Sequence, residues 1–226
     1  NKLPMSTFET NIKGTWCVLE ACRHEAVSTA VIASSDKSYG TPISLPYTEE
    51  HRLQAFAPYD VSKACADMIA QSYFKSFALP VRITRCANIY GPGDTSPTRL
   101  IPQTIASILK NEEPVIRSDG KFERDYMYID DAVNAYIKLA EADGEANGEA
   151  FNFGTNKPVS VIQIVEQILN LMKSNLEYTV MNQVTNEIKR QSLDWSKAKH
   201  YLNWKPEIDL KDGLTKTIEW HRTQSK

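Results

Sequence analysis

The sequence predicts an α/β protein in which helices cover both faces of a parallel sheet and a smaller mixed lobe follows. Apolar runs of strand length alternate with segments of helical period over the first half of the chain. Residues 29–34 are continuously apolar rather than alternating, which is typical of a buried parallel strand. After residue 111 the elements become shorter and more mixed. We therefore expect a main domain over 1–111 and a second lobe over 112–226, with some elements of the second part returning to the main domain.

The first part begins with an amphipathic helix at about 7–23, because Phe8, Ile12, Trp16 and Leu19 recur at helical spacing. The strand at 29–34 and a polar loop follow it. Further elements are a helix after Pro58 with Val61, Cys65, Met68, Ile69 and Tyr73 on one face, a strand at 81–86 ended by the turn cluster 90–93, and a helix containing Leu100, Ile101, Thr104, Ile105 and Ile108.

The second part contains shorter elements. Strands are expected at 114–117 and 124–129, and a helix capped by Asp130 or Asp131 comes next. A strand around Phe151, a helix capped by Ser160, a strand near 178–181 and two closing helices complete the chain.

Composition excludes several classes of protein. The 226 residues are 42% hydrophobic, and a formal charge of −2 is spread without long runs of one sign. This pattern argues against a nucleic-acid partner and against a polybasic membrane patch, and no apolar stretch approaches the length of a membrane span. The four cysteines form no CxxC pair, so we expect structural thiols in a reducing cytoplasm and no metal site.

Tyr59 and Lys63 are spaced i, i+4 at the start of a predicted helix and therefore share a face. A lysine ammonium beside a phenol favours the phenolate and lowers the pKa of the tyrosine, which yields a general base at cellular pH. Taken alone, the pair is better explained as part of a solvated helix face.

The strand at 29–34 ends in a cluster of polar residues, Ser34, Ser35, Asp36 and Lys37. This places hydroxyls and two titratable groups at the carboxyl edge of a parallel strand, where open α/β sheets bind ligands. The alternative is a polar turn closed by an Asx hydrogen bond.

Five segments follow one another in a familiar order: Asn11-Ile-Lys-Gly-Thr15, Ser35-Asp-Lys-Ser-Tyr-Gly40, Tyr59-Asp-Val-Ser-Lys63, Arg85-Cys-Ala-Asn-Ile-Tyr-Gly-Pro-Gly93 and Arg124-Asp-Tyr-Met-Tyr-Ile-Asp-Asp131. Together they resemble the NAD-dependent epimerase/dehydratase family of extended short-chain dehydrogenases, over nearly the whole chain. The resemblance implies a Rossmann-type doubly wound sheet, of which 1–111 is the remainder of the dinucleotide-binding domain and 112–226 mainly the substrate lobe.

The resemblance also implies a role for individual residues. Ser35, Tyr59 and Lys63 would form the hydride-transfer triad. The cofactor NAD, or NADP, would contact Ser34, Tyr59, Lys63, Cys86 and Ala87, with Lys63 on the nicotinamide ribose. The substrate would contact Asn88 and Arg124 through its diphosphate and Leu100 and Ile101 near its base. Arg117 and Arg190 are further phosphate candidates, with solvated surface arginines as the alternative reading, and Asn11 would support the backbone of the site.

The Asp36–Lys37 pair indicates which reaction to expect. Related 4,6-dehydratases carry Asp-Glu or Asp-Lys after the triad serine, and the pair here resembles the CDP-glucose 4,6-dehydratase type. Oxidation of C4 acidifies the C5 proton, so an acid for the C6 hydroxyl and a base for C5 are needed together. We expect Asp36 as the acid, Lys37 as the base or as the group that tunes Asp36, and a nucleotide-diphosphate hexose as substrate. A nucleotide-sugar 4-epimerase and a non-catalytic dinucleotide-binding regulatory protein remain alternatives.

Two further expectations concern the rest of the protein. The family's glycine-rich turn, which holds the dinucleotide pyrophosphate, is not found in these 226 residues and is expected upstream. The resemblance also implies a homodimer, in which the helix 8–23 and the Tyr59 helix form a four-helix bundle with their copies.

Overall fold

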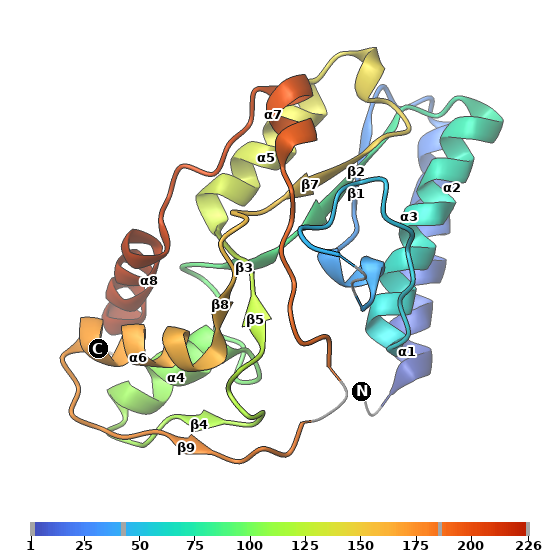
Figure 1. Ribbon diagram of the computed structural model, residues 1–226. Coiled ribbons are helices and arrows are strands. Elements are labelled where there is room, and N and C mark those ends of the chain that lie inside the picture. The colour runs from blue at the N-terminus through green and yellow to red at the C-terminus, as the bar shows by residue number, and fades with distance from the viewer. Residues whose placement is uncertain (1–2, 42–43, 185–186, 225–226) are drawn as a thin grey trace.

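A computed structural model describes residues 3–41, 44–184 and 187–224 (Figure 1). The helices are α1 Pro4–Phe8, α2 Gly14–His24, α3 Pro58–Phe77, α4 Leu100–Leu109, α5 Ile129–Glu141, α6 Val161–Met172, α7 Ser196–Leu202 and α8 Leu210–Gln224. The strands are β1 Ala30–Ala33, β2 Val81–Cys86, β3 Asn88–Tyr90, β4 Val115–Ile116, β5 Glu123–Arg124, β6 Tyr126–Tyr128, β7 Ala150–Phe153, β8 Val159–Ser160 and β9 Thr179–Val180. Across these ranges no helix combines the length and the apolar composition that a membrane span requires.

The main sheet contains three parallel strands in the order β1-β2-β7. Helices α2 and α3 pack on one face, and α5 and α7 lie on the other side (Figure 1). The centre strand β2 is buried along its whole length, as a parallel strand covered on both faces should be. This α/β architecture with a parallel sheet confirms the predicted fold class.

The first helix is longer than expected and is interrupted by a π-helical segment. Helix α1 runs into the π-helical residues Glu9–Lys13 and continues as α2 to His24. The interruption carries Asn11, whose Nδ2 donates to Ser62 Oγ on α3 at 2.9 Å. The sequence prediction of one helix at 7–23 is therefore right in place but lacks this irregular turn, which hydrophobic spacing does not report.

Helix α3 buries its small and polar residues rather than its large apolar ones. Ala64, Ala66 and Ala70 are buried together with Asp67, whereas Met68 is 62% exposed. Small side chains let the helix lie close to the sheet. The predicted apolar stripe through Met68 consequently lies partly on the surface beside α1 and α2.

The second lobe is built from short two-stranded pairs and three helices. The strand pairs are β3-β6, β4-β9 and β5-β8, and helices α4, α6 and α8 pack together beside them. Ile101 and Ile105 meet Ile164, Ile168 and Leu214 in the core of this lobe. A domain boundary near residue 111 stays a prediction.

The beginning of α5 corrects one expectation from the sequence. Neither Asp130 nor Asp131 caps the helix. Tyr128 occupies the N-cap position, and its side chain accepts no backbone N–H of the first turn. Asp131 instead lies buried in the first turn and accepts the backbone N–H groups of Glu207 and Ile208 at 3.0 and 3.1 Å. The carboxylate therefore fastens a distant segment to α5, a contact that local sequence cannot reveal.

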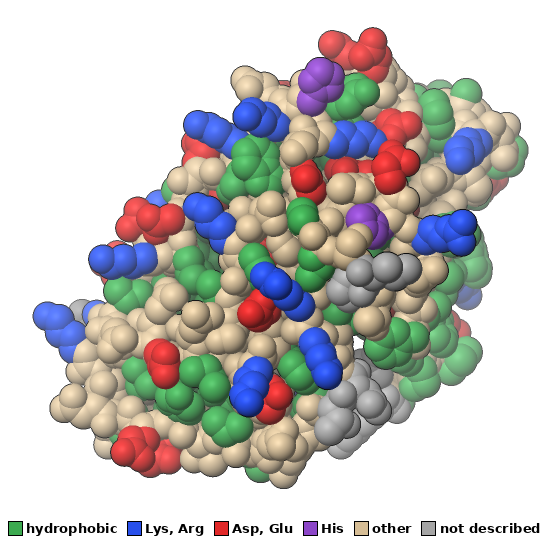
Figure 2. Space-filling view, in the orientation of Figure 1, with side chains coloured by type: hydrophobic (Ala, Val, Ile, Leu, Met, Phe, Trp, Pro, Cys, Tyr) green, Lys and Arg blue, Asp and Glu red, His purple; other side chains and the backbone are tan. Residues whose placement is uncertain are grey.

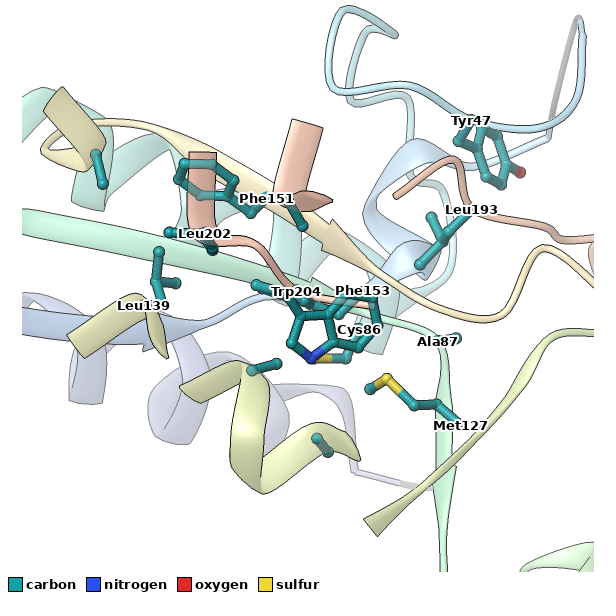
Figure 3. Packing of buried hydrophobic residues seen from close by; sticks show 14 of the residues in the cluster. Tyr47, Cys86, Ala87, Met127, Leu139, Phe151, Phe153, Leu193, Leu202 and Trp204 are labelled. Carbon is teal, nitrogen blue, oxygen red and sulfur yellow. The ribbon is translucent and has the colours of Figure 1, made fainter. Parts of the chain in front are cut away.

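A cluster of large side chains fills the space between the sheet and the chain after β7 (Figure 3). The rings of Phe153 and Trp204 meet edge to face with centroids 5.0 Å apart. The Trp204 indole N–H donates to the backbone oxygen of Asp131 at 3.1 Å, so the one polar atom of the ring is satisfied. Cys86 and Met127 complete the contact between this core and the carboxyl end of β2.

Candidate active site

The polar cluster predicted from the sequence lies at the carboxyl end of β1, beside the end of β2. Residues Asp36–Tyr39 form a 3-10 turn, and the Ser35 hydroxyl caps it by accepting the Lys37 backbone N–H at 3.3 Å. The turn ends at Gly40, where φ is +71° and an added Cβ would come within 2.1 Å of Gln54 O. Glycine is therefore required there, and it lets the chain turn back sharply after the polar cluster.

Asp36 is the centre of a small hydrogen-bond network. Its Oδ1 accepts from Ser35 Oγ at 3.0 Å and from Lys37 Nζ at 3.4 Å. The same Lys37 ammonium donates to Asn88 Oδ1 at 3.1 Å, which links the end of β1 to β3. Asp36 is only 1% exposed, and within the described ranges its Oδ2 has no hydrogen-bond partner. One oxygen of this buried carboxylate is thus left without a hydrogen bond from the described chain.

A buried ion pair fixes α3 against the sheet and against this turn. Arg85 on β2 donates from Nε and Nη2 to both oxygens of Asp67, at 2.8 and 3.0 Å. Its third contact is Nη1 to Tyr39 Oη at 3.0 Å, so the pair also holds the 3-10 turn. The bidentate geometry orients both partners. Tyr59, at the start of α3, is positioned relative to Asp36 through this network.

Tyr59 and Lys63 do not form the expected pair in the structure. The Lys63 ammonium donates to Ala33 O at 3.0 Å, and burial lowers its pKa. The pKa of Tyr59 is raised, first by burial and then by the carboxylates of Asp36 and Asp60. The sequence prediction of a lowered tyrosine pKa is therefore wrong, since spacing along a helix does not fix where a flexible ammonium points.

A cavity of about 570 Å³ opens between the 3-10 turn, the start of α3 and the second lobe. It gathers six of the residues predicted from the sequence: Lys37, Tyr59, Asn88, Leu100, Ile101 and Arg124. Its size suits a ligand with several polar groups. The two sides of the cavity differ in chemistry. Charged and polar groups lie near β1 and α3, and apolar groups lie along α4.

The remaining predicted residues lie outside the cavity lining. Ser35 and Asp36 are buried beneath Lys37, and Ser34, Cys86 and Ala87 are buried at the ends of β1 and β2. Arg117 is exposed, and Arg190 pairs with Glu123 at 2.6 Å while it is largely exposed. Neither arginine lines the cavity, whereas Arg124 does and its Nη2 contacts Glu187 Oε2 at 3.1 Å. The predicted functional roles themselves remain predictions.

Several polar residues of the cavity were not predicted, among them Asp94, Arg99, Glu187, Asp60 and Gln191. Asp60 is 8% exposed and lies directly after Tyr59. Gln191 is 1% exposed, and neither its amide nitrogen nor its amide oxygen has a hydrogen-bond partner among the described residues. Adjacency to Tyr59 could have signalled Asp60, but no pattern in the sequence distinguishes Gln191 from a surface residue of a loop.

Within the part of the chain that the structure describes, no group of three His, Cys, Asp or Glu side chains is arranged to hold a metal ion. The polar groups that line the cavity include the Lys37 ammonium, the Tyr59 phenol, the Asn88 amide and the Arg124 guanidinium, and the buried Asp36 carboxylate lies next to Lys37. This set of groups suits proton transfer and the binding of an anion.

The parallel sheet and the Ser-Asp-Lys turn beside a Tyr-x-x-x-Lys helix define a protein of the extended short-chain dehydrogenase class. A family model described as GDP-mannose 4,6 dehydratase matches residues 2–217. The chain therefore belongs to this family of NAD-dependent epimerases and dehydratases, which confirms the resemblance found in the sequence.

Three relatives illustrate the range of the family. The human dTDP-D-glucose 4,6-dehydratase is 33% identical over 218 residues, which are 94% of this chain and 61% of that protein. The structure of dTDP-glucose 4,6-dehydratase from Bacillus anthracis in complex with NAD is 31% identical with a TM-score of 0.88, over 99% of this chain and 70% of that one. The UDP-glucose 4-epimerase of Thermotoga maritima with UDP-glucose is 27% identical with a TM-score of 0.93, over 99% and 72% of the two chains. The chain thus spans 61% of the length of its human relative.

Proposed function

We propose that the protein is a nucleotide-sugar 4,6-dehydratase that uses NAD and removes water across C5 and C6 of a hexose. The observation that carries this proposal is the Asp36–Lys37 pair, with Nζ 3.4 Å from Oδ1 and the other carboxylate oxygen without a hydrogen-bond partner in the described chain. An acid and a base held side by side match the two proton transfers of the elimination. The named dehydratases of humans and Bacillus anthracis support the same reaction.

The first step oxidises the hexose at C4. Tyr59 takes the proton of the 4-hydroxyl while the hydride leaves C4. Tyr59 needs a cation nearby for this task, because burial and the carboxylates of Asp36 and Asp60 raise its pKa. Lys63 lies one helical turn away on the same face and would supply that charge when its ammonium turns from Ala33 O towards the phenol.

The second step eliminates water from the 4-keto sugar. The ketone at C4 acidifies the C5 proton. Lys37 accepts this proton as the C5–H bond of the sugar breaks. Asp36 delivers its proton to the C6 hydroxyl, and the C6–O bond breaks with loss of one water molecule. Lys37 Nζ donates to Asp36 Oδ1 and to Asn88 Oδ1, so Lys37 acts as a base only after it has passed a proton on, and the Asp36 carboxylate is the basic group of the two.

The residues at the carboxyl ends of β1 and β2 fit the nicotinamide half of NAD. Cys86 and Ala87 present a buried, uncharged surface, and burial raises the pKa of the Cys86 thiol to about 12, so that this group stays neutral. Lys63 lies beside them as the donor for the ribose hydroxyls. When bound there, NAD would supply the hydride acceptor for C4 and the hydride donor for C6, while Lys37 would return a proton to C5. NADP is an alternative that these residues do not distinguish.

The cavity beyond the reacting groups suits the nucleotide diphosphate. Arg124 supplies a guanidinium fork for phosphate oxygens, and its present partner Glu187 is 54% exposed on its side chain and so easily displaced. Asn88 would contact the diphosphate, and Leu100 and Ile101 would cover the base.

The decisive experiment separates the two chemical steps. Asp36→Asn keeps the size of the side chain but removes its transferable proton, and loss of a general acid costs about 10²–10⁴-fold in rate. The full-length variant should still form reduced NAD when given CDP-glucose or another hexose nucleotide, yet accumulate little 4-keto-6-deoxy product. Tyr59→Phe should stop both steps. The absorbance of reduced NAD measures the oxidation step. Mass spectrometry of the sugar nucleotide measures the loss of water.

A 4-epimerase is the second candidate, and the fold similarity to the Thermotoga maritima epimerase favours it. The product mass distinguishes the two reactions, because dehydration lowers the mass by one water and epimerisation leaves it unchanged. A broad panel of hexose nucleotides that yields only the C4 epimer with the wild type would refute the dehydratase proposal. NAD binding with no reaction of any kind would favour a regulatory protein.

The setting of the enzyme is part of the proposal. We propose a cytoplasmic homodimer with no nucleic-acid or membrane partner. Apolar side chains of the N-terminal helices and α3 support the dimer: Leu3, Met5, Trp16, Val18, Met68 and Phe77 are all exposed. Figure 2 shows hydrophobic side chains gathered at the edge of the molecule where these helices lie. The cysteines support a reducing compartment, because all four are free thiols.

A further inference from the structure

Asp60 is a cavity residue that neither the family resemblance nor the chemistry above uses. The other carboxylates that line the cavity have ionic partners: Asp94 lies 2.8 Å from Arg99, and Glu187 lies 3.1 Å from Arg124. Asp60 has neither an ion pair nor a hydrogen bond within the described ranges, although only 8% of the residue is exposed. The Asp60 carboxylate therefore reaches the cavity with hydrogen-bonding capacity that no described protein group uses.

The charged groups around Asp60 locate it within the cavity. Its pKa is raised to about 6, mainly by burial, and Lys37 and Arg124 lower it while Asp36 and Glu187 raise it. Lys37 and Asp36 belong to the 3-10 turn that follows β1, whereas Arg124 and Glu187 belong to the second lobe. Asp60 therefore lies between the groups that would act on the hexose and the arginine that would hold the diphosphate.

The structural alternative is that Asp60 stabilises the helix on which it lies. It occupies the first turn of α3, where a negative charge interacts favourably with the helix dipole. Such acids usually accept a backbone N–H, but α3 has no side-chain capping hydrogen bond. An exposed carboxylate would serve the dipole equally well without the cost of burial.

We propose that Asp60 accepts a hydrogen bond from a ring hydroxyl of the bound hexose other than the 4-hydroxyl, and so selects sugars that carry it. This inference rests on the proposed hexose-nucleotide function. The reasoning is chemical: a diphosphate is repelled by a carboxylate, an apolar base offers it little, and the 4-hydroxyl belongs to Tyr59. The hydroxyls at C2 and C3 are the remaining donors on the ring between these groups. Asp60 is thus a specificity-determining residue rather than an acid or base of the reaction.

The test is a cycle between enzyme and substrate variants at pH 7.5, where Asp60 is ionised. Full-length wild type and Asp60→Ala are each assayed with the hexose nucleotide and with its 2-deoxy and 3-deoxy analogues. A hydrogen bond to a charged group corresponds to about 10- to 150-fold in kcat/KM. We expect that loss for the wild type with one of the two analogues, and for Asp60→Ala with the intact sugar. The variant should then lose nothing further with that analogue, because the same bond is already absent.

Asp130→Ala is the matched control, because Asp130 is an exposed acid in the first turn of α5, away from the cavity. It should leave all three substrates unaffected. The proposal would be overturned if, for both analogues, the loss of kcat/KM from the missing hydroxyl and the loss from Asp60→Ala multiplied. An unchanged kcat/KM for Asp60→Ala with the intact sugar would also overturn it. If the wild type binds the sugars without dehydrating them, the proposed function fails while the same cycle, measured as dissociation constants by calorimetry, still decides on Asp60. Absence of any binding would overturn both.

Discussion

Burial of the Asp60 carboxylate makes the stability of the protein depend on pH. The carboxyl has a pKa of about 6 in the folded state against 3.8 for the unperturbed group. Between these values the folded state binds more protons than the unfolded state, so stability falls as pH rises from about 4 to about 6 and then levels. Asp60→Asn removes this dependence. At pH 7.5 the variant should be more stable than the wild type by at most about 3 kcal/mol, with no such gain at pH 4.

Urea unfolding of the ligand-free protein at a series of pH values measures this difference. Asp130→Asn is the control, since an exposed acid should show no comparable gain. If Asp60→Asn is destabilised at pH 7.5, the carboxylate contributes to the helix dipole more than its burial costs, and the raised pKa does not describe the folded protein.

The individual residues of the site were predictable to unequal degrees. Tyr59, Lys37 and Asn88 could be predicted because short motifs fix them at the ends of strands and helices, and the cavity brings all three together. The position of the Lys63 ammonium could not, because four rotatable bonds separate it from the backbone and a carbonyl competes for it. Gln191 escaped notice for another reason: its burial depends on a loop folding back over the cavity.

The capping box of α6 is a local feature with a measurable effect. Ser160 Oγ accepts the Gln163 backbone N–H at 3.2 Å, and Gln163 Oε1 accepts the Ser160 N–H at 2.8 Å. Ser160→Ala leaves both ends of this reciprocal pair weakened and should lower the free energy of unfolding by about 0.5–2 kcal/mol. Urea unfolding measures the loss, with Ser76→Ala on the exposed surface of α3 as the control. An equal loss in both variants would contradict the capping explanation.

The elements show why some boundaries follow from sequence and others do not. Helix α6 begins where the sequence predicts, because the serine and the glutamine of its cap are neighbours in the chain. Helix α5 has two candidate caps, yet the buried Asp131 accepts backbone N–H groups from Glu207 and Ile208. The role of Asp131 is thus decided by a contact with a segment far away in the chain. The local sequence pattern therefore predicted the helix correctly and its cap wrongly.

The exposed apolar side chains of α2 and α3 bear on the state of the whole molecule. Trp16 is 44% exposed and Met68 62% exposed, an arrangement that favours contact with a second copy. Met68→Glu would place a charge in that contact, and we expect the full-length variant to elute as a monomer where the wild type elutes as a dimer. Light scattering after gel filtration at micromolar concentration measures the mass directly.

Val133→Glu is the matched control for the dimer. Val133 is 49% exposed on α5, on the other side of the sheet, so its replacement should leave the mass unchanged. A wild type that is monomeric under these conditions would refute the dimer. Dissociation by both variants would instead indicate a contact through α5.

The order β1-β2-β7 has a consequence for how the protein folds. Strands β1 and β2 and the helix between them are close in the chain, whereas β7 pairs with β2 only after the chain has passed through β3 to β6, α4 and α5. Closing so long a loop costs entropy before any contact is gained, so β7 is expected to join the sheet late and slowly. Asn152 on β7 accepts a hydrogen bond from Tyr39 Oη at 2.7 Å and donates one to the backbone oxygen of Tyr47 at 3.0 Å. These contacts, which help to hold the 3-10 turn Asp36–Tyr39, therefore form only when the last strand joins the sheet.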